Sequence, residues 1–442
     1  MGIASLKERF SMGQIAGALT LAYLAVCILV PKGSSTIVLL AYTLCMGVLG
    51  LLAGRDRLRR FFSIPTIVLC VGLVVSLGLM FAFSPYPKAN AVRLICYLIC
   101  LAVVHVIYED GAPDGLNRWF LRLASLAILV LLIIKFTQPG FFEAHSPFER
   151  SNGEDAPLLP SGIDKNGTAL FAFMVFCMCF KARYVPGIVL GLLYPLSYFG
   201  RQYIMMMGIF ILFELLLFIA GRIEKKRDRK LFGHPPVVAK FVAVFLAFVL
   251  SFGAMAAFST YWLNNVSSQG VEEYKTSLND GSNAMRMLAN QVALDRITQD
   301  PAFLIYGYDT DIYEALGISQ TLSGKNHNVY INGLRLVQPH EEVINTVLKE
   351  GVLFSLLYYA GLSAVIAVIL RRRNLPIFAA LFVGSLVFHS MFSSYTVILL
   401  CFAMALARSW KLPSTGAHSR REQPDGVRAL RARMTYSWGL WI

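Results

Sequence analysis

Long apolar segments recur along most of the chain and are separated by short polar breaks. Segments of about 17 to 25 mainly apolar residues have the length of an α-helix that crosses the hydrocarbon core of a membrane. The pattern predicts about twelve spans, near residues 13–31, 35–53, 62–83, 93–108, 120–137, 167–180, 185–200, 203–221, 236–258, 343–370, 375–391 and 394–408. We therefore expect an all-α integral membrane protein, with nine spans in residues 1–258 and three in residues 343–408.

Two stretches are too polar to span a membrane, and the larger is residues 259–342, between the ninth and tenth predicted spans. Loops of this length usually carry a function of their own. Within it, residues 282–298 place apolar side chains at helical spacing, which predicts an amphipathic helix that could rest on the membrane surface. Residues 301–338 look irregular, with short helical pieces.

The distribution of basic residues predicts the orientation of the spans. The chain has a formal net charge of +14 and 40 Lys and Arg residues. About two thirds of these fall on the segments that share a side with the N-terminus, as cytoplasmic segments do. This asymmetry accounts for the charge without a nucleic-acid partner. We expect both termini in the cytoplasm, residues 259–342 outside, and a disordered cytoplasmic tail over residues 409–442.

The residues that usually bind metals are poorly arranged for it. All eight cysteines lie in predicted spans, so the outer loops contain no thiols for a disulfide framework. No Cys/His zinc spacing is present, and the nearest acidic pair, Asp309 and Asp311, is more simply explained as a solvated loop. We expect no metal and no cofactor.

Three arginines on the predicted outer side run against the inward bias of positive charge. Arg201 lies between two short apolar runs, and Arg286 and Arg296 lie on the predicted amphipathic helix. Ten residues separate the last two, which puts them about 80° apart around a helix. Such cations can bind a phosphate or pyrophosphate. Equally, Arg201 could reach the lipid headgroups, and the other two could pair with nearby aspartates or lipid phosphate.

His340 marks the boundary between the long loop and the tenth predicted span. It stands in Pro339-His340-Glu341-Glu342, and Glu350-Gly351 follows near the outer end of that span. The ordinary pKa of imidazole lies close to neutral pH, so a histidine above a membrane cleft can exchange a proton with a substrate. The alternative is a solvent-exposed helix start whose acids interact with the helix dipole.

Taken in order, these residues resemble the O-antigen ligase and polymerase superfamily over residues 160–370. The resemblance is carried by Asn166, Gly200-Arg201, Arg286, Asp300-Pro301 through Tyr306-Gly307-Tyr308, and Pro339-His340 to Glu350-Gly351. Its most specific part is a histidine followed ten and eleven residues later by Glu-Gly at the start of a span. This chain has Glu341 directly after the histidine, where the family usually has asparagine.

The resemblance implies a GT-C-like architecture and a metal-independent, inverting glycosyltransferase in the bacterial inner membrane. Such an enzyme takes a glycan from undecaprenyl pyrophosphate and, for a ligase, attaches it to lipid A-core oligosaccharide at the periplasmic face. His340 would then act as general base or hydrogen-bond the pyrophosphate. The leaving pyrophosphate would be stabilised by basic side chains, with further polar residues nearby. These are Arg201, Arg286 and Arg296, with Asn166, Glu341 and Glu350 as additional candidates.

Two other functions remain open at the level of sequence. An O-antigen polymerase or a protein O-oligosaccharyltransferase would use the same donor with a different acceptor. A transporter would be indicated instead by ionisable residues inside the spans, of which the chain has Glu214, His105 and His389. The two halves of the chain show no internal repeat, which weakens the transporter interpretation.

Overall fold

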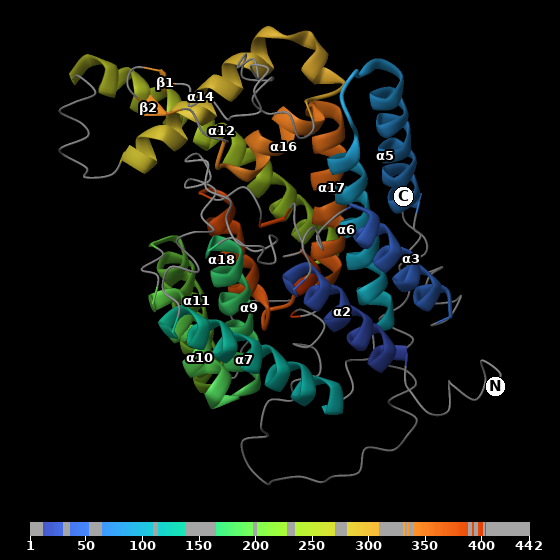
Figure 1. Cartoon of the computed structure of the whole chain (residues 1–442), viewed down its shortest axis with the longest axis vertical. Helices are drawn as coiled ribbons and strands as arrows, with labels where there is room; N and C mark the ends of the chain where they lie inside the picture. The colour runs from blue at the N-terminus through green and yellow to red at the C-terminus, as the bar shows by residue number, and fades with distance from the viewer. Residues whose placement is uncertain are drawn as a thin grey trace. The chain divides into compact units, whose positions relative to one another are not determined.

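The fold is given by a computed structural model, and the residues that it describes are helical almost throughout (Figure 1). They are residues 12–29, 36–52, 64–108, 114–137, 165–197, 201–227, 235–269, 281–308, 330–331, 334–335, 339–387, 391–392, 397–400 and 403. Within these ranges the extended structure consists of one short antiparallel pair, β1 (Tyr330–Ile331) and β2 (Leu334–Arg335).

Most helices follow the predicted spans to within a few residues. Their bounds are α2 (Met12–Leu29), α3 (Thr36–Leu52), α5 (Ile64–Phe83), α6 (Ala89–Ile107), α7 (Asp114–Thr137), α9 (Lys165–Ala182), α10 (Val185–Ser197), α11 (Arg201–Arg227), α12 (Val237–Gln269), α14 (Gly281–Gln299), the 3-10 helix η2 (Pro301–Leu304), α16 (Glu342–Glu350), α17 (Val352–Ile369) and α18 (Leu375–Ser385).

Five helices in the described part of the chain are long and apolar enough to cross a membrane. They are Thr66–Phe83, Ala89–Ile107, Tyr203–Glu224, Val237–Trp262 and Val352–Ile369, and further apolar helices are shorter. The chain therefore has the helices of a multi-pass membrane protein. Most of the last predicted span and the whole tail, residues 409–442, lie outside the described residues.

α9 lies at the centre of one group of helices. Every side chain from Ala169 to Cys179 is buried, which is what a helix that is apolar on all sides requires. α10 packs most closely against it, with α7 and α11 also in contact. A Cβ atom at Gly191 would lie 2.9 Å from the Cα atom of Phe176, so only glycine permits this approach of α10 to α9.

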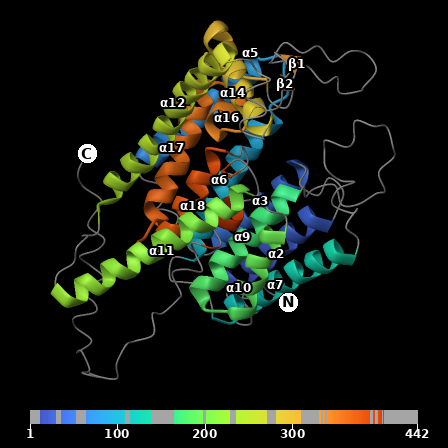
Figure 2. The same ribbon diagram turned by 90° about the vertical axis from the view of Figure 1, so that its left-hand side faces the viewer.

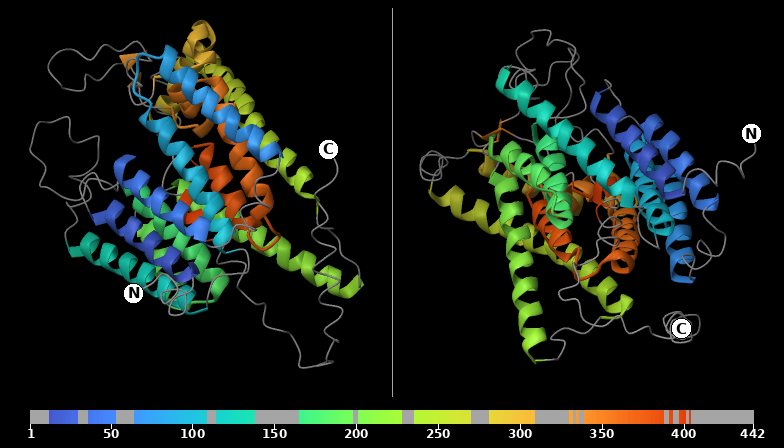
Figure 3. Two further views of the ribbon diagram at one scale, coloured as in Figure 1. Left: turned by 90° about the vertical axis from the view of Figure 1, so that its right-hand side faces the viewer. Right: turned by 90° about the horizontal axis from the view of Figure 1, so that it is seen from below.

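α17 organises a second group of helices. It packs along both α12 and α5, and it also contacts α6 (Figures 2 and 3). α18 in turn packs along α11 (Figure 2). The helices that precede and follow the long loop are therefore direct neighbours, and they bring the two ends of that loop together.

Two boundaries differ from those expected. The span predicted over residues 343–370 is divided into α16 and α17 by Gly351, whose φ of 83° lies in the left-handed region. Apolar residues continue across this glycine, which is why their pattern indicated a single helix. The ninth span, predicted to end at residue 258, continues as helix to Gln269.

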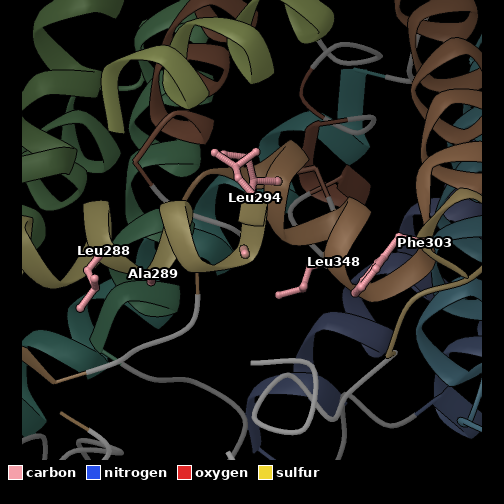
Figure 4. Packing of buried hydrophobic residues seen from close by; sticks show 7 residues of the cluster. Leu288, Ala289, Leu294, Phe303 and Leu348 are labelled. Atoms are coloured by element: carbon pink, nitrogen blue, oxygen red, sulfur yellow. The ribbon is translucent and has the colours of Figure 1, made fainter. Parts of the chain in front are cut away.

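The predicted amphipathic helix is present as α14, and its apolar side is buried against other parts of the protein. Leu288, Ala289 and Leu294 form a cluster with Phe303 and Leu348 (Figure 4). α14 also packs against α12. α14 is thereby held against α16, the helix that directly follows His340.

Candidate functional site

His340 lies immediately before α16, and two contacts fix the chain at this point. Glu341 is the N-cap of α16, where its Oε2 atom accepts a hydrogen bond from the backbone N–H of Ile344 at 2.5 Å. The backbone N–H of His340 donates to Oδ1 of Asn290 at 3.3 Å. The histidine is half-buried. Its backbone is thus held from both sides, by α16 and by α14.

Asn290 also fixes where Arg286 lies relative to His340. The asparagine is buried, and Arg286, which is half-buried, precedes it by four residues on α14. Residues four apart share a helix face and lie about 6 Å apart along the axis. The structure therefore brings Arg286 to the neighbourhood of His340, although 54 residues separate them in the sequence (340 − 286 = 54).

A chain of contacts leads from the first turns of α11, which begins at Arg201, to the start of α16. A Cβ atom at Gly384 of α18 would lie 2.8 Å from the sulfur of Met206 and 3.1 Å from the methyl carbon of Met391. The backbone N–H of Met391 donates to Oε2 of Glu342 at 2.7 Å. Met206 is five residues after Arg201, about 7.5 Å along the helix. The side chain of Arg201 lies outside the described residues.

The two acids after His340 are fully buried, which the sequence did not predict. The pKa of the Glu341 carboxyl is raised to about 8, mainly by burial and less by the neighbouring Glu342, although hydrogen bonds from the backbone of Ile344 and Val343 and from Ser251 lower it. A charge here is therefore disfavoured. Glu341 does serve the start of the helix as its N-cap, but this start is not exposed, because α12 contacts Glu341 through Ser251.

The other end of α16 forms a second polar contact. Glu350 is fully buried and accepts a hydrogen bond from the side chain of Asn90, in the first turn of α6. The backbone N–H of Tyr308 donates to the carbonyl of Leu348 at 3.1 Å, and the ring of Tyr308 packs on Tyr86 with centroids 4.4 Å apart. The segment after α14 is thus clamped between α16 and the turn that precedes α6.

Sequence reasoning missed the start of α6 as part of this region. Lys88 is buried and donates from Nζ to the carbonyl of Ser84 at 3.0 Å, and Arg93 is half-buried one turn later. Both lie beside Asn90, which reaches Glu350. The sequence did contain an indication of this, because residues 84–92 fall on the predicted outer side. A cation there runs against the inward bias of positive charge, as Arg201 does.

The remaining candidates are not brought to His340 by any described contact. Arg296 is exposed and lies about 15 Å further along α14 than Arg286. Asn166 belongs to the first turn of α9, and its side chain is outside the described residues, as are Asp309 and Asp311.

Of the ionisable residues that suggested transport, Glu214 has an identified partner. It forms an ion pair with Lys181 of α9. A charge within a membrane span needs such a partner for structural reasons alone, so the pair does not by itself indicate transport. His105 is half-buried in α6, and His389 lies outside the described residues.

The described arrangement combines His340, which can exchange a proton, with Arg286, a permanent cation one helical turn from Asn290, which binds the histidine backbone. The parts of α14 and α16 that hold them are largely buried. A guanidinium near a histidine can stabilise negative charge while the imidazole accepts or donates a proton. Comparison with models of known protein families finds no match for this chain, and neither does a search among curated proteins.

Proposed function

We propose that the chain is a glycosyltransferase of the O-antigen ligase kind, with about twelve spans in the bacterial inner membrane and a site on the periplasmic face. It transfers a polysaccharide from undecaprenyl pyrophosphate to a lipid A-core oligosaccharide, without a metal and with inversion at the anomeric carbon. The proposal joins the resemblance in sequence to the geometry around α16.

The observation that supports this proposal most is the hydrogen bond between Asn290 and the backbone of His340. This hydrogen bond holds α14, which carries Arg286, against His340, the residue expected to accept the proton. Neither Arg286 nor His340 needs such a connection if both are only solvated surface residues. The contacts from Met206 through Gly384 and Met391 to Glu342 connect the start of α11, where Arg201 lies, to the same region.

In the proposed reaction, the acceptor hydroxyl oxygen forms a bond to the anomeric carbon of the donor sugar. The bond from that carbon to the pyrophosphate oxygen breaks, and the electron pair leaves with the pyrophosphate. The hydroxyl proton passes to His340. Arg286 and Arg201 stabilise the charge that grows on the pyrophosphate, because the guanidinium is planar and permanently charged. A single displacement of this kind inverts the anomeric configuration.

The membrane helices suit the donor as well as the reaction. Undecaprenyl is a long apolar chain, so the sugar pyrophosphate has to be presented at the membrane boundary. α5, α11 and α12 expose many large apolar side chains, as helices that face lipid do. The donor can therefore approach His340 from within the bilayer while the acceptor approaches from the periplasm.

Reconstitution in liposomes with lipid-linked glycan tests the proposal and separates its alternatives. Three acceptors are supplied in parallel: lipid A-core, growing glycan and a protein substrate. Glycan on lipid A-core supports the ligase. Product only on growing glycan identifies a polymerase, and product only on protein identifies an oligosaccharyltransferase. Substrate flux that survives loss of both His340 and Arg201, with no transfer to any acceptor, identifies a transporter.

A further inference from the structure

Glu342, the first residue of α16, binds a segment of the chain that follows α18. It is fully buried, and its Oε2 atom accepts a hydrogen bond from the backbone N–H of Met391 at 2.7 Å. The next residue of that segment is held as well, because the hydroxyl of Tyr358 on α17 donates to the carbonyl of Phe392. Neither Met391 nor Phe392 is helical. Side chains of α16 and α17 thus bind two backbone groups that no helix satisfies.

The start of α16 and the segment after α18 meet inside the bundle. α18 has 11 residues, so it extends about 16 Å from the turn that joins it to α17. Tyr359, whose hydroxyl contacts the carbonyl of Glu342, is 11 residues before Leu370 (370 − 359 = 11), so it lies about 16 Å from the same end of α17. The ring of Phe248 on α12 packs against both Tyr359 and Phe392. Lipid supplies no hydrogen bonds at this depth, so a non-helical N–H group needs a partner from the protein. On this ground alone, Glu342 would only support the fold.

Glu342 also lies between two parts of the candidate site. It follows His340 by two positions and belongs to the first turn of α16. On its other side, the methyl carbon of Met391 and the sulfur of Met206 border the same glycine of α18, at 3.1 Å and 2.8 Å from the position that a Cβ atom would take there. Met206 belongs to α11, which begins at Arg201 and packs along α18. The carboxyl of Glu342 therefore connects the chain next to His340 with the helix that carries Arg201.

We propose that Glu342 is a positioning residue for glycosyl transfer, and that through the N–H of Met391 it sets the place of α11, and hence of Arg201, relative to His340. The inference rests on the proposed function and on the roles of Arg201 and His340 in it. Glu342 does not touch the substrate, because its side chain is enclosed by protein. Its effect is on alignment, since the proton acceptor and the cation that stabilises the leaving pyrophosphate have to act on one sugar in the same step.

Glu342→Ala removes the acceptor of the Met391 N–H, so the segment after α18 is released from α16. A displacement of about 1 Å between reacting groups can lower a rate about 100-fold. Transfer by the full-length protein is measured in liposomes with lipid A-core as acceptor. We expect kcat of Glu342→Ala to fall about 10- to 100-fold, while KM for the lipid-linked donor changes less than about threefold, because Arg201 and His340 are both still present.

Two further substitutions at Glu342 and one at Tyr358 complete the set. Glu342→Gln keeps an oxygen at the same reach and should recover most of kcat. Glu342→Asp keeps the acceptor but shortens the side chain by one methylene group, so its loss should be intermediate. Tyr358→Phe is the matched control, because it removes the hydrogen bond to the next residue of the same segment and leaves the link to α16 in place. It should lower the melting temperature but change kcat less than about twofold.

A double-mutant cycle with Arg201→Ala separates alignment from general support of the fold. If Glu342 acts by placing Arg201, its substitution has little left to disturb once the guanidinium is gone. The loss of kcat caused by Glu342→Ala should therefore shrink to less than about threefold in the Arg201→Ala background. A residue that only supports the fold would give the same loss in both backgrounds, so that the two losses multiply.

Three results of these assays would overturn the inference. They are a folded Glu342→Ala variant with the kcat of the wild type, losses that multiply in the double variant, and a loss of kcat in Tyr358→Phe equal to that in Glu342→Ala. If Glu342→Ala does not fold, Glu342→Asp takes its place in the same cycle with Arg201→Ala, and the same three results apply to it.

Hydrogen exchange tests the contact without any transfer assay. Mass spectrometry follows exchange in the peptide that contains Met391, whose N–H is protected by its bond to Glu342. Exchange there should be faster in Glu342→Ala than in the wild type and in Glu342→Gln. An unchanged rate in Glu342→Ala contradicts the inference. If the wild type transfers to no acceptor, the proposed function fails, while the exchange rate still decides whether Glu342 holds this segment.

Discussion

At the scale of single residues, one buried amide links the two groups on which the proposed chemistry depends. Asn290 accepts the backbone N–H of His340 and lies one turn from Arg286. General acid–base groups are effective only when they are held within hydrogen-bonding reach of the reacting atoms. The position of the histidine is therefore set by its neighbours in α14 and α16, and changes in these neighbours should affect the reaction.

The first prediction concerns the reacting side chains. His340→Ala, Arg286→Ala and Arg201→Ala should each lower the rate of glycan transfer by about 10² to 10⁴. Arg222→Ala is the control, because Arg222 is an exposed cation at the other end of the helix that begins at Arg201, where it packs on Phe218. The measurement is the initial rate in proteoliposomes with equal protein content. Retained activity in any purified variant would remove that residue from the site.

The second prediction concerns Asn290, which no sequence motif singled out. Asn290→Ala leaves the N–H of His340 without its acceptor, which should lower the free energy of unfolding by about 1 to 3 kcal/mol and reduce transfer. Gln291→Ala is the matched control, because the neighbouring amide is half-buried and bonds to Thr260 and Asp295 near the surface. Thermal unfolding and transfer are measured for both. Equal effects would show that the amide of Asn290 has no special role.

At the scale of elements, the break between α16 and α17 determines where α16 ends. Gly351 has φ 83° and lies against the backbone of the segment that follows α14. This break ends α16 at Glu350, where the carboxyl meets Asn90 of α6.

The third prediction tests this break. Gly351→Ala places a Cβ atom 2.8 Å from the backbone nitrogen of Tyr306 and forces a positive φ on an L residue. We expect a loss of about 2 kcal/mol or more in the free energy of unfolding. Gly253→Ala on α12 is the control, since its Cβ atom would meet nothing within 4 Å and alanine favours the helix. Thermal unfolding of both variants distinguishes the effects. A stable Gly351→Ala variant would mean that the break is not required.

At the scale of the whole molecule, the two ends of α17 differ in the way that an oriented membrane protein requires. One end adjoins Glu350 and the segment after α14. At the other end Arg372 pairs with Glu224 at 2.6 Å, and Lys240 donates to the carbonyl of Leu370 at 2.9 Å. Arg372 and Lys240 therefore lie at the end that the predicted orientation assigns to the cytoplasm.

The fourth prediction follows from this orientation. Alkaline phosphatase fused after residue 275 should be active, because that loop is expected in the periplasm, whereas a fusion after residue 230 should be inactive. Fluorescent-protein fusions at the same positions should give the reverse result. Phosphatase activity at both positions, or at residue 230 alone, would contradict the proposed topology and the periplasmic site.

The candidate site could be predicted from the sequence only in part. Arg286 and His340 were found because each stands out locally, one as an outward cation and the other as a histidine at a membrane boundary. Asn290, Asn90 and Ser251 give no such signal, because a polar residue in an apolar or amphipathic stretch is common. Their roles depend on contacts across 50, 260 and 90 residues of sequence respectively.

The sequence by itself determined the helical membrane character and most helix positions, because apolar length and periodicity are local properties of the chain. It also located α14 as an amphipathic helix, without indicating what its apolar side contacts. Only the tertiary structure decided that α14 packs on α16, that Gly351 separates two helices, and that Glu341 and Glu342 are buried. These outcomes depend on which distant segments meet, and burial of a charge is favourable only where such segments supply its hydrogen-bond partners.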